Sequence, residues 1–230
     1  MNVRTTIVFS SLALIYLATL PLTPYVAQFL PKALPIVVLA VFAYTKLSAM
    51  PRYMVLAALL FSLAGDVSLA LPFADSFITG LACFFVAHLT YAMCFALLHR
   101  RLVETPGDHI ISRKPKWFIS IIMVSFAVMM AVHILPASKA LFYPVVAYIS
   151  VITLMGLTAV WLAQTKLIVT GALFFVISDA ILAQSVFKTP LPLSTIWVMT
   201  TYYGAQYCLT MGLVDGFLRK ENRQEEIGQT

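Results

Sequence analysis

The chain has 230 residues, of which 61% are hydrophobic and only 10% are charged. Soluble domains carry about 25% charged residues, so this composition and a mean hydropathy of +0.94 exclude a globular domain with a single anchor. The net charge of +6 does not indicate nucleic-acid binding, because the basic residues fall in loops and tails rather than on one helix face. The sequence predicts an all-α, polytopic transmembrane bundle that occupies residues 1–230 as one integral membrane domain.

A helix that crosses the hydrocarbon needs about 20 apolar residues. In chain order the predicted spans are 5–21, 30–45, 53–71, 77–98, 117–135, 141–163, 167–187 and 194–217. The second span is short and prolines flank its start, so a partly re-entrant segment is the alternative there. The first span resembles a signal peptide, but we expect an uncleaved helix because spans of the same kind follow at once.

The loops differ strongly in their content of Lys and Arg. With eight spans, twelve of these residues fall on one side of the membrane and three on the other. The loop 99–116 holds five of the twelve, and the tail 219–230 holds three. Basic residues mark the cytoplasmic side. We therefore expect both termini in the cytoplasm, the protein in the cell (inner) membrane, and contacts from the basic residues to anionic membrane lipids.

A short motif occurs twice. The third predicted span contains Gly65-Asp66-Val67-Ser68-Leu69-Ala70, and the seventh contains Ser178-Asp179-Ala180-Ile181-Leu182-Ala183. The span after each motif carries a polar residue, His88 or Gln206. The pattern predicts two four-helix half-repeats, about 1–100 and 116–218, related by an axis along the membrane normal. Chance similarity between apolar helices is the alternative.

Asp66 and Asp179 are the most informative residues of the sequence. A carboxylate at membrane depth costs at least about 2.5 kcal/mol, so it must face other protein or a wet cavity. Both acids lie about 13 residues, or about 20 Å, from the predicted cytoplasmic end of their helices. At equal depth in two half-repeats, they could face each other as a catalytic pair. The structural alternative is an interhelical hydrogen bond that only stabilises the bundle.

Helical spacing places six further polar or aromatic side chains on the faces of these acids or of the helices that follow them. They are His88, Tyr91, Ser178, Tyr202, Tyr203 and Gln206. We expect them to bind or orient a substrate, although a hydrogen-bonded core histidine and packed aromatic rings are the alternatives.

Lys32 lies at the outer end of the second predicted span, between two prolines. A lysine at this position can extend to the membrane interface or hold a lipid phosphate as a point charge. A zinc site made of Asp66, Asp179 and His88 is a weaker alternative, because His88 is the only histidine well inside a span. We predict no metal and no cofactor.

Five short motifs occur in order between about residues 30 and 210. They are Pro31-Lys32-Ala33-Leu34-Pro35, Gly65-Asp66-Val67-Ser68-Leu69, Ala87-His88-Leu89-Thr90-Tyr91, Ser178-Asp179-Ala180-Ile181-Leu182-Ala183 and Tyr202-Tyr203-Gly204-Ala205-Gln206. Together they resemble the YhhN-like family of membrane proteins, which includes the lysoplasmalogenases. Ala33 departs from the family, which often has Pro or Cys there. The resemblance implies hydrolysis of the vinyl ether bond of lysoplasmalogen to a fatty aldehyde and glycerophosphoethanolamine or glycerophosphocholine.

This chemistry suits the predicted acids. Protonation of the vinyl ether leaves an oxocarbenium ion, to which water adds. One aspartate would donate the proton, and the other would act as base and stabilise the cation, much as paired carboxyl groups do in glycosidases. Lys32 would hold the phosphate of the lysophospholipid. The rival hypothesis is a proton-coupled transporter or a lipid-binding protein that uses the same aspartates. The sequence identifies no protein partner.

Overall fold

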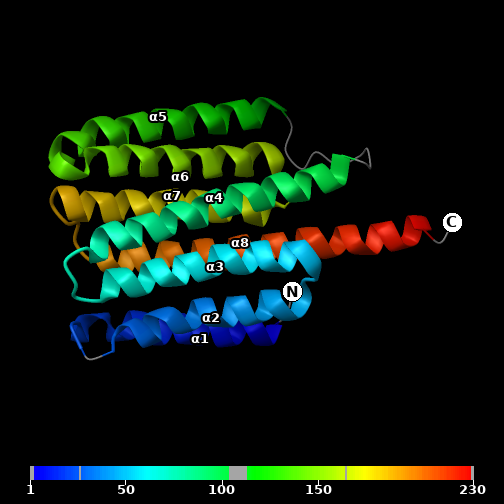
Figure 1. Ribbon diagram of the computed structural model, residues 1–230, viewed down its shortest axis with the longest axis horizontal. Helices are drawn as coiled ribbons and strands as arrows, with labels where there is room; N and C mark the ends of the chain where they lie inside the picture. The colour runs from blue at the N-terminus through cyan, green and yellow to red at the C-terminus, as the bar shows by residue number, and fades with distance from the viewer. Residues whose placement is uncertain (1–2, 26, 104–112, 164, 229–230) are drawn as a thin grey trace.

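The computed structural model describes residues 3–25, 27–103, 113–163 and 165–228. These residues form eight α-helices and no β-strand, which confirms the all-α prediction. The helices are α1 (Val3–Thr19), α2 (Phe29–Lys46), α3 (Ala49–Ala70), α4 (Ser76–Val103), α5 (Arg113–Ser138), α6 (Phe142–Leu162), α7 (Lys166–Phe187) and α8 (Ser194–Gly228). Consecutive helices run in opposite directions along one common axis, so the described connections lie at the two ends of the bundle (Figure 1).

Six segments within the described residues are long and apolar enough to cross a membrane. One of them, Pro115–Leu162, is 48 residues long and contains both α5 and α6. The helix α8 is not among the six, because Thr, Tyr, Gln and Gly interrupt its apolar residues. The chain is therefore an integral membrane protein, whereas the count of eight spans and the cytoplasmic location of the termini stay predictions.

Local sequence explains where several helices begin and bend. The hydroxyl oxygen of Thr165 accepts a hydrogen bond from the backbone N–H of Ile168, which caps the start of α7. The helix α2 continues through Pro35 without a break, as membrane helices tolerate when neighbouring groups satisfy the backbone. Its unbroken 18 residues favour a spanning helix over the re-entrant alternative.

Two helix pairs carry the two acids. Asp66 lies on α3, which packs closely on α4, and Asp179 lies on α7, which packs closely on α8. The helix α4 also packs on α6, and α8 packs on α2. The helix α5 lies at the edge of the bundle, mainly against α6 (Figure 1). Each pair thus contacts a helix of the other predicted half, but the half-repeats themselves stay a prediction.

Glycine allows the close approach of α7 and α8. A Cβ atom at Gly171 would lie 2.9 Å from the backbone nitrogen of Leu209, and one at Gly212 would lie 3.0 Å from that of Ile168. No side chain fits between backbones at this distance, as in other membrane helix pairs built on small residues. The two glycines therefore set the distance between α7 and α8.

Three helices continue into segments predicted as loop or tail. The helix α4 ends at Val103 and α5 begins at Arg113, so only 104–112 of the predicted loop 99–116 lies outside the described residues. The helix α8 has 35 residues and continues to Gly228. At 1.5 Å per residue it is about 52 Å long, more than the roughly 30 Å of hydrocarbon. Its last turns extend beyond the bundle on the side where the N-terminus lies (Figure 1).

Candidate active site

Asp179 is held by side chains from two neighbouring helices. The hydroxyl of Tyr148, on α6, donates to Oδ2 of Asp179 at 2.5 Å. Nε2 of His88, on α4, lies 3.1 Å from the same oxygen and 3.1 Å from the Tyr148 hydroxyl. Because a carboxyl oxygen without a proton can only accept, the hydrogen-bond pattern assigns a proton to Nε2 of His88. We call these three residues the Asp179 cluster.

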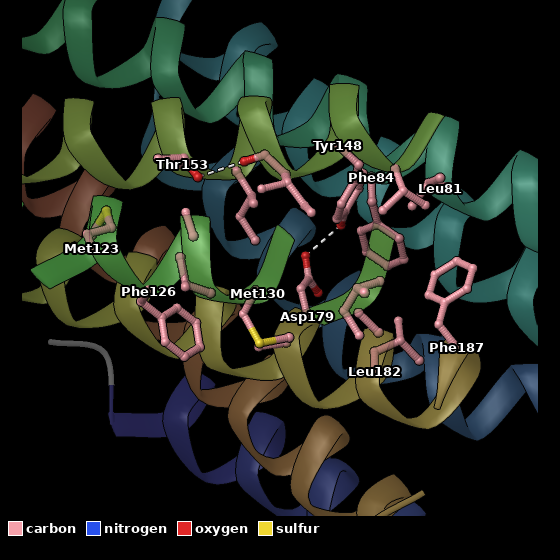
Figure 2. Close-up of a pocket in the computed structure, with 18 of the residues that line it drawn as sticks. Leu81, Phe84, Met123, Phe126, Met130, Tyr148, Thr153, Asp179, Leu182 and Phe187 are labelled. Carbon is pink, nitrogen blue, oxygen red and sulfur yellow. Dashed lines mark hydrogen bonds between the residues drawn. The ribbon is translucent and has the colours of Figure 1, made fainter. Parts of the chain in front are cut away.

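The Asp179 cluster lies at the wall of a large apolar cavity. The cavity encloses about 840 Å³ of space, part of it open to the outside, mainly between α4, α5, α6 and α7. Its lining is hydrophobic except for Tyr148, Thr153 and Asp179. Figure 2 shows the carboxylate among aliphatic and aromatic side chains, with the Tyr148 hydroxyl beside it. Such a lining suits an aliphatic chain.

Asp66 has a different environment, a buried ion pair with Lys32. Nζ of Lys32 lies 3.1 Å from Oδ1 of Asp66 and donates at 3.1 Å to the backbone carbonyl of the same residue. The side chains of Lys32 and Asp66 are only 11% and 4% exposed. The Tyr203 hydroxyl donates to the backbone carbonyl of Lys32 at 2.9 Å. Lys32 therefore points into the bundle, and the alternative that it extends to the interface is wrong.

Aromatic rings separate the two acids. Phe84 lines the cavity and packs edge-on against Phe175 and Tyr202, with ring centroids 6.3 and 5.9 Å away. Tyr202 interacts electrostatically with Asp66. The Phe84 ring also lies directly on Gly65, where a Cβ atom would come within 2.7 Å of it. The carboxylates thus form two clusters on either side of this ring layer, and only Asp179 lines the described cavity.

The remaining predicted site residues join α8 to the helices around it. The Tyr91 hydroxyl donates to Oε1 of Gln206 at 2.6 Å, and both side chains are fully buried. The Ser178 hydroxyl donates to the backbone carbonyl of Val198 at 3.0 Å, which links α7 to α8. Ser178 thus packs on α8 although it precedes Asp179 in the chain.

Tyr148 belongs to the candidate site, but the sequence did not single it out. It shares a helical face with Ile152 and Met155, at spacings of four and seven residues. On such an apolar helix an aromatic residue usually indicates packing, so the spacing alone carries no sign of the hydrogen bond to Asp179.

The described residues contain no group of three or more His, Cys, Asp and Glu side chains placed to hold a metal ion. Asp66, Asp179 and His88, which the zinc alternative needs together, are divided between the two clusters. The arrangement of these side chains therefore gives the zinc alternative no support.

Comparison with known proteins assigns the chain to a family. The model of the YhhN family matches residues 27–213, which include both clusters and the cavity. The chain belongs to the YhhN family. This membership confirms the resemblance that the five sequence motifs indicate.

Several relatives of this YhhN family protein have names that state an activity. Lysoplasmalogenase TMEM86B from Homo sapiens is 34% identical over 190 residues, which cover 79% of this chain and 73% of the relative. TMEM86B from Sus scrofa is 31% identical, with 68% and 61% covered. Lysoplasmalogenase TMEM86A from Bos taurus is 29% identical, with 68% and 63% covered. The matched region thus spans less than two thirds of the last two relatives. No solved structure matches the chain significantly.

Proposed function

We propose that this protein is a lysoplasmalogenase, a membrane hydrolase that cleaves the vinyl ether bond of a lysoplasmalogen by acid-base catalysis. The observation that carries the proposal is the position of Asp179. It is a carboxyl group at membrane depth, held by Tyr148 and His88, at the wall of an apolar cavity. The names of the relatives support the same reaction.

The reaction adds one water molecule across the vinyl ether. A protonated carboxyl group transfers its proton to the β-carbon, and the π electrons that form this C–H bond leave an oxocarbenium ion. The oxygen of water then bonds to the α-carbon and gives up one proton to a base. The resulting hemiacetal loses its hydroxyl proton as the bond to the glycerol oxygen breaks, and that oxygen takes up a proton. The products are a fatty aldehyde and a glycerol hydroxyl, with no net release of protons.

Asp179 is the proton donor in this proposal. Tyr148 and His88 both bind Oδ2, which leaves Oδ1 to carry the proton toward the substrate. After transfer, the two hydrogen bonds stabilise the negative charge that Asp179 develops, and this charge stabilises the adjacent cation. The hydrophobic lining takes the alkenyl chain and keeps bulk water from the reactive intermediate.

Asp66 is the second acid of the proposal, acting as base. The ion pair with Lys32 holds its Oδ1, while Phe84 and Tyr202 lie between it and the cavity. Asp66 can take up a proton from the reacting water only if the two clusters are connected. In this arrangement Lys32 positions Asp66, so a direct contact with the lipid phosphate would require the ion pair to open.

The test is an assay of aldehyde release from lysoplasmalogen by the purified protein. We expect Asp179→Asn and Asp66→Asn each to lower kcat by at least about 100-fold, the scale of a lost general acid or base. Asp215→Asn is the matched control, because Asp215 is half-exposed and forms an ion pair with Arg219 on the same helix. Full activity of Asp179→Asn would refute the proposal.

The buried pair of Lys32 and Asp66 favours one other function. Paired charges inside a membrane bundle also serve proton-coupled transporters. Proteoliposomes that show proton-driven flux of a lysophospholipid, without release of aldehyde, would support a transporter instead.

A further inference from the structure

Five buried polar atoms in the Asp66 pair, in the Asp179 cluster and on one face of α8 form no hydrogen bond of good geometry among the residues that the structure describes. They are Oδ2 of Asp66, Nδ1 of His88, the hydroxyl of Tyr202, Nε2 of Gln206 and the hydroxyl of Thr210. Each of these residues is at most 3% exposed. The Tyr202 hydroxyl lies near enough to the Asp66 carboxylate to interact with it, so these two groups can satisfy each other in part. Polar groups buried to this degree are almost always bonded to protein or to ordered water. The atoms of His88, Gln206 and Thr210 therefore indicate a ligand that can satisfy them.

The five atoms gather around one ring and one helix face. The Phe175 ring lies 4.5 Å from the ring of His88 and 5.5 Å from that of Tyr202, measured between centroids. Gln206 and Thr210 follow Tyr202 at intervals of four residues, so the three share a face of α8, about 6 Å apart along its axis. Asp66 lies beside Tyr202. The group extends from the acids about 12 Å along α8 toward its C-terminal end.

The chemistry of the five atoms matches water. Nε2 of Gln206 can only donate, and Oδ2 of Asp66 accepts. Nδ1 of His88 accepts when Nε2 carries the ring proton, and the two hydroxyl groups can do either. A water molecule has two donors and two acceptors, and a buried one makes about three hydrogen bonds. Because the group extends over about 12 Å, it would hold several water molecules in a row.

We propose that these five groups form an internal water-binding site that joins the Asp66 pair to the Asp179 cluster and supplies the water that the hydrolysis consumes. The second part rests on the proposed function. His88 is central, because its Nε2 contacts Asp179 while its Nδ1 is available to the water. The apolar cavity holds the lipid, and the α8 face delivers the other reactant. This connection also gives Asp66 a route to accept a proton across the aromatic layer.

Radiolytic hydroxyl-radical labelling tests the water site directly, because buried side chains are modified quickly only when water lies beside them. The full-length protein is irradiated in detergent without substrate. We expect Tyr202 to be labelled at least tenfold faster than Phe42, after correction for the intrinsic reactivity of each side chain. Both side chains are buried in the same hydrophobic core, but only Tyr202 carries a polar atom of the proposed water site. Labelling of Tyr202 no faster than that of Phe42 would overturn the proposal.

A matched pair of variants tests the role in the reaction. Gln206→Leu keeps the side-chain size but removes both the amide donor and the acceptor of the Tyr91 hydrogen bond. We expect slower labelling of Tyr202 and a fall in kcat of at least tenfold. KM should stay within twofold, because Gln206 does not line the cavity. Gln184→Leu, near the C-terminal end of α7, is the matched control and should change neither the labelling of Tyr202 nor kcat. If Gln206→Leu aggregates, Thr210→Val replaces it with the same expected changes.

The two proposals fail in different ways. Rapid labelling of Tyr202 in a protein that releases no aldehyde would keep the water site and reject the lysoplasmalogenase activity. Release of aldehyde without labelling of Tyr202 would keep the activity and reject the water site. Normal kcat in Gln206→Leu, with labelling lost, would reject the role of the site in supplying water.

Discussion

Replacement of Tyr148 by Phe removes a single hydroxyl group from the proposed active site. That hydroxyl donates to Oδ2 of Asp179 at 2.5 Å and lies 3.1 Å from Nε2 of His88. The ring and its apolar contacts remain, so the cavity keeps its shape. The variant therefore isolates the hydrogen bond to the acid.

The size of the effect follows from the charge that Asp179 develops. A hydrogen bond to a charged group contributes about 1.5–3 kcal/mol. If this bond stabilises the carboxylate formed in the transition state, its loss lowers kcat about 10-fold to 150-fold, since each 1.36 kcal/mol is a factor of ten. KM should change little, because the hydroxyl is a small part of an apolar lining.

Aldehyde release at saturating and limiting lysoplasmalogen separates kcat from KM. Tyr143→Phe is the matched control, because Tyr143 lies five residues earlier on α6 and is 81% exposed. Equal kcat in Tyr148→Phe and the parent protein would show that Tyr148 only packs, and the assignment of Asp179 as the proton donor would lose its structural basis.

Three further predictions concern stability and metal dependence. Lys32→Met leaves Asp66 buried without its partner, so we expect a loss of about 3–5 kcal/mol in unfolding free energy. Lys32→Met combined with Asp66→Leu should recover part of this loss. Additive losses in the double variant would show that the two residues are not coupled. Gly65→Ala places a methyl group 2.7 Å from the Phe84 ring. Overpacking of a core usually lowers the unfolding free energy by about 1–3 kcal/mol, so Tm should fall by several degrees. An unchanged Tm would show that Phe84 moves freely. Chelators should leave aldehyde release unchanged, and a loss that zinc restores would support the metal alternative.

Apolar patterning predicted the fold closely, because the bilayer demands long hydrophobic runs that end where loops begin. Each of the eight predicted spans corresponds to a helix, and most ends agree within a few residues. The differences lie at 99–116 and 219–230, where helices continue past the apolar run. Hydropathy indicates where a chain leaves the hydrocarbon, but it does not indicate where a helix that continues into water ends.

The candidate site was only partly predictable. Asp66, Asp179 and His88 stand out because charged and polar groups are costly inside a membrane. Their pairing depends on how each helix is rotated about its axis, and a single sequence does not determine this rotation. Lys32 lies near the start of α2, where the sequence allowed either extension to the interface or a contact with a lipid phosphate, but the structure turns it inward onto Asp66. The residues three and four positions from Tyr148 on its helix are all apolar, so the spacing does not single it out.

The contacts around the acids cross between the two predicted halves. Asp179 belongs to the second half, but its histidine, His88, lies on α4 of the first. Asp66 belongs to the first half, and Tyr202 beside it lies on α8 of the second. The two acids nevertheless have different surroundings, because Asp66 pairs with Lys32 while Asp179 binds Tyr148 at the wall of the cavity. The proposed acid-base mechanism needs such a difference, because one carboxyl group must give up a proton while the other takes one.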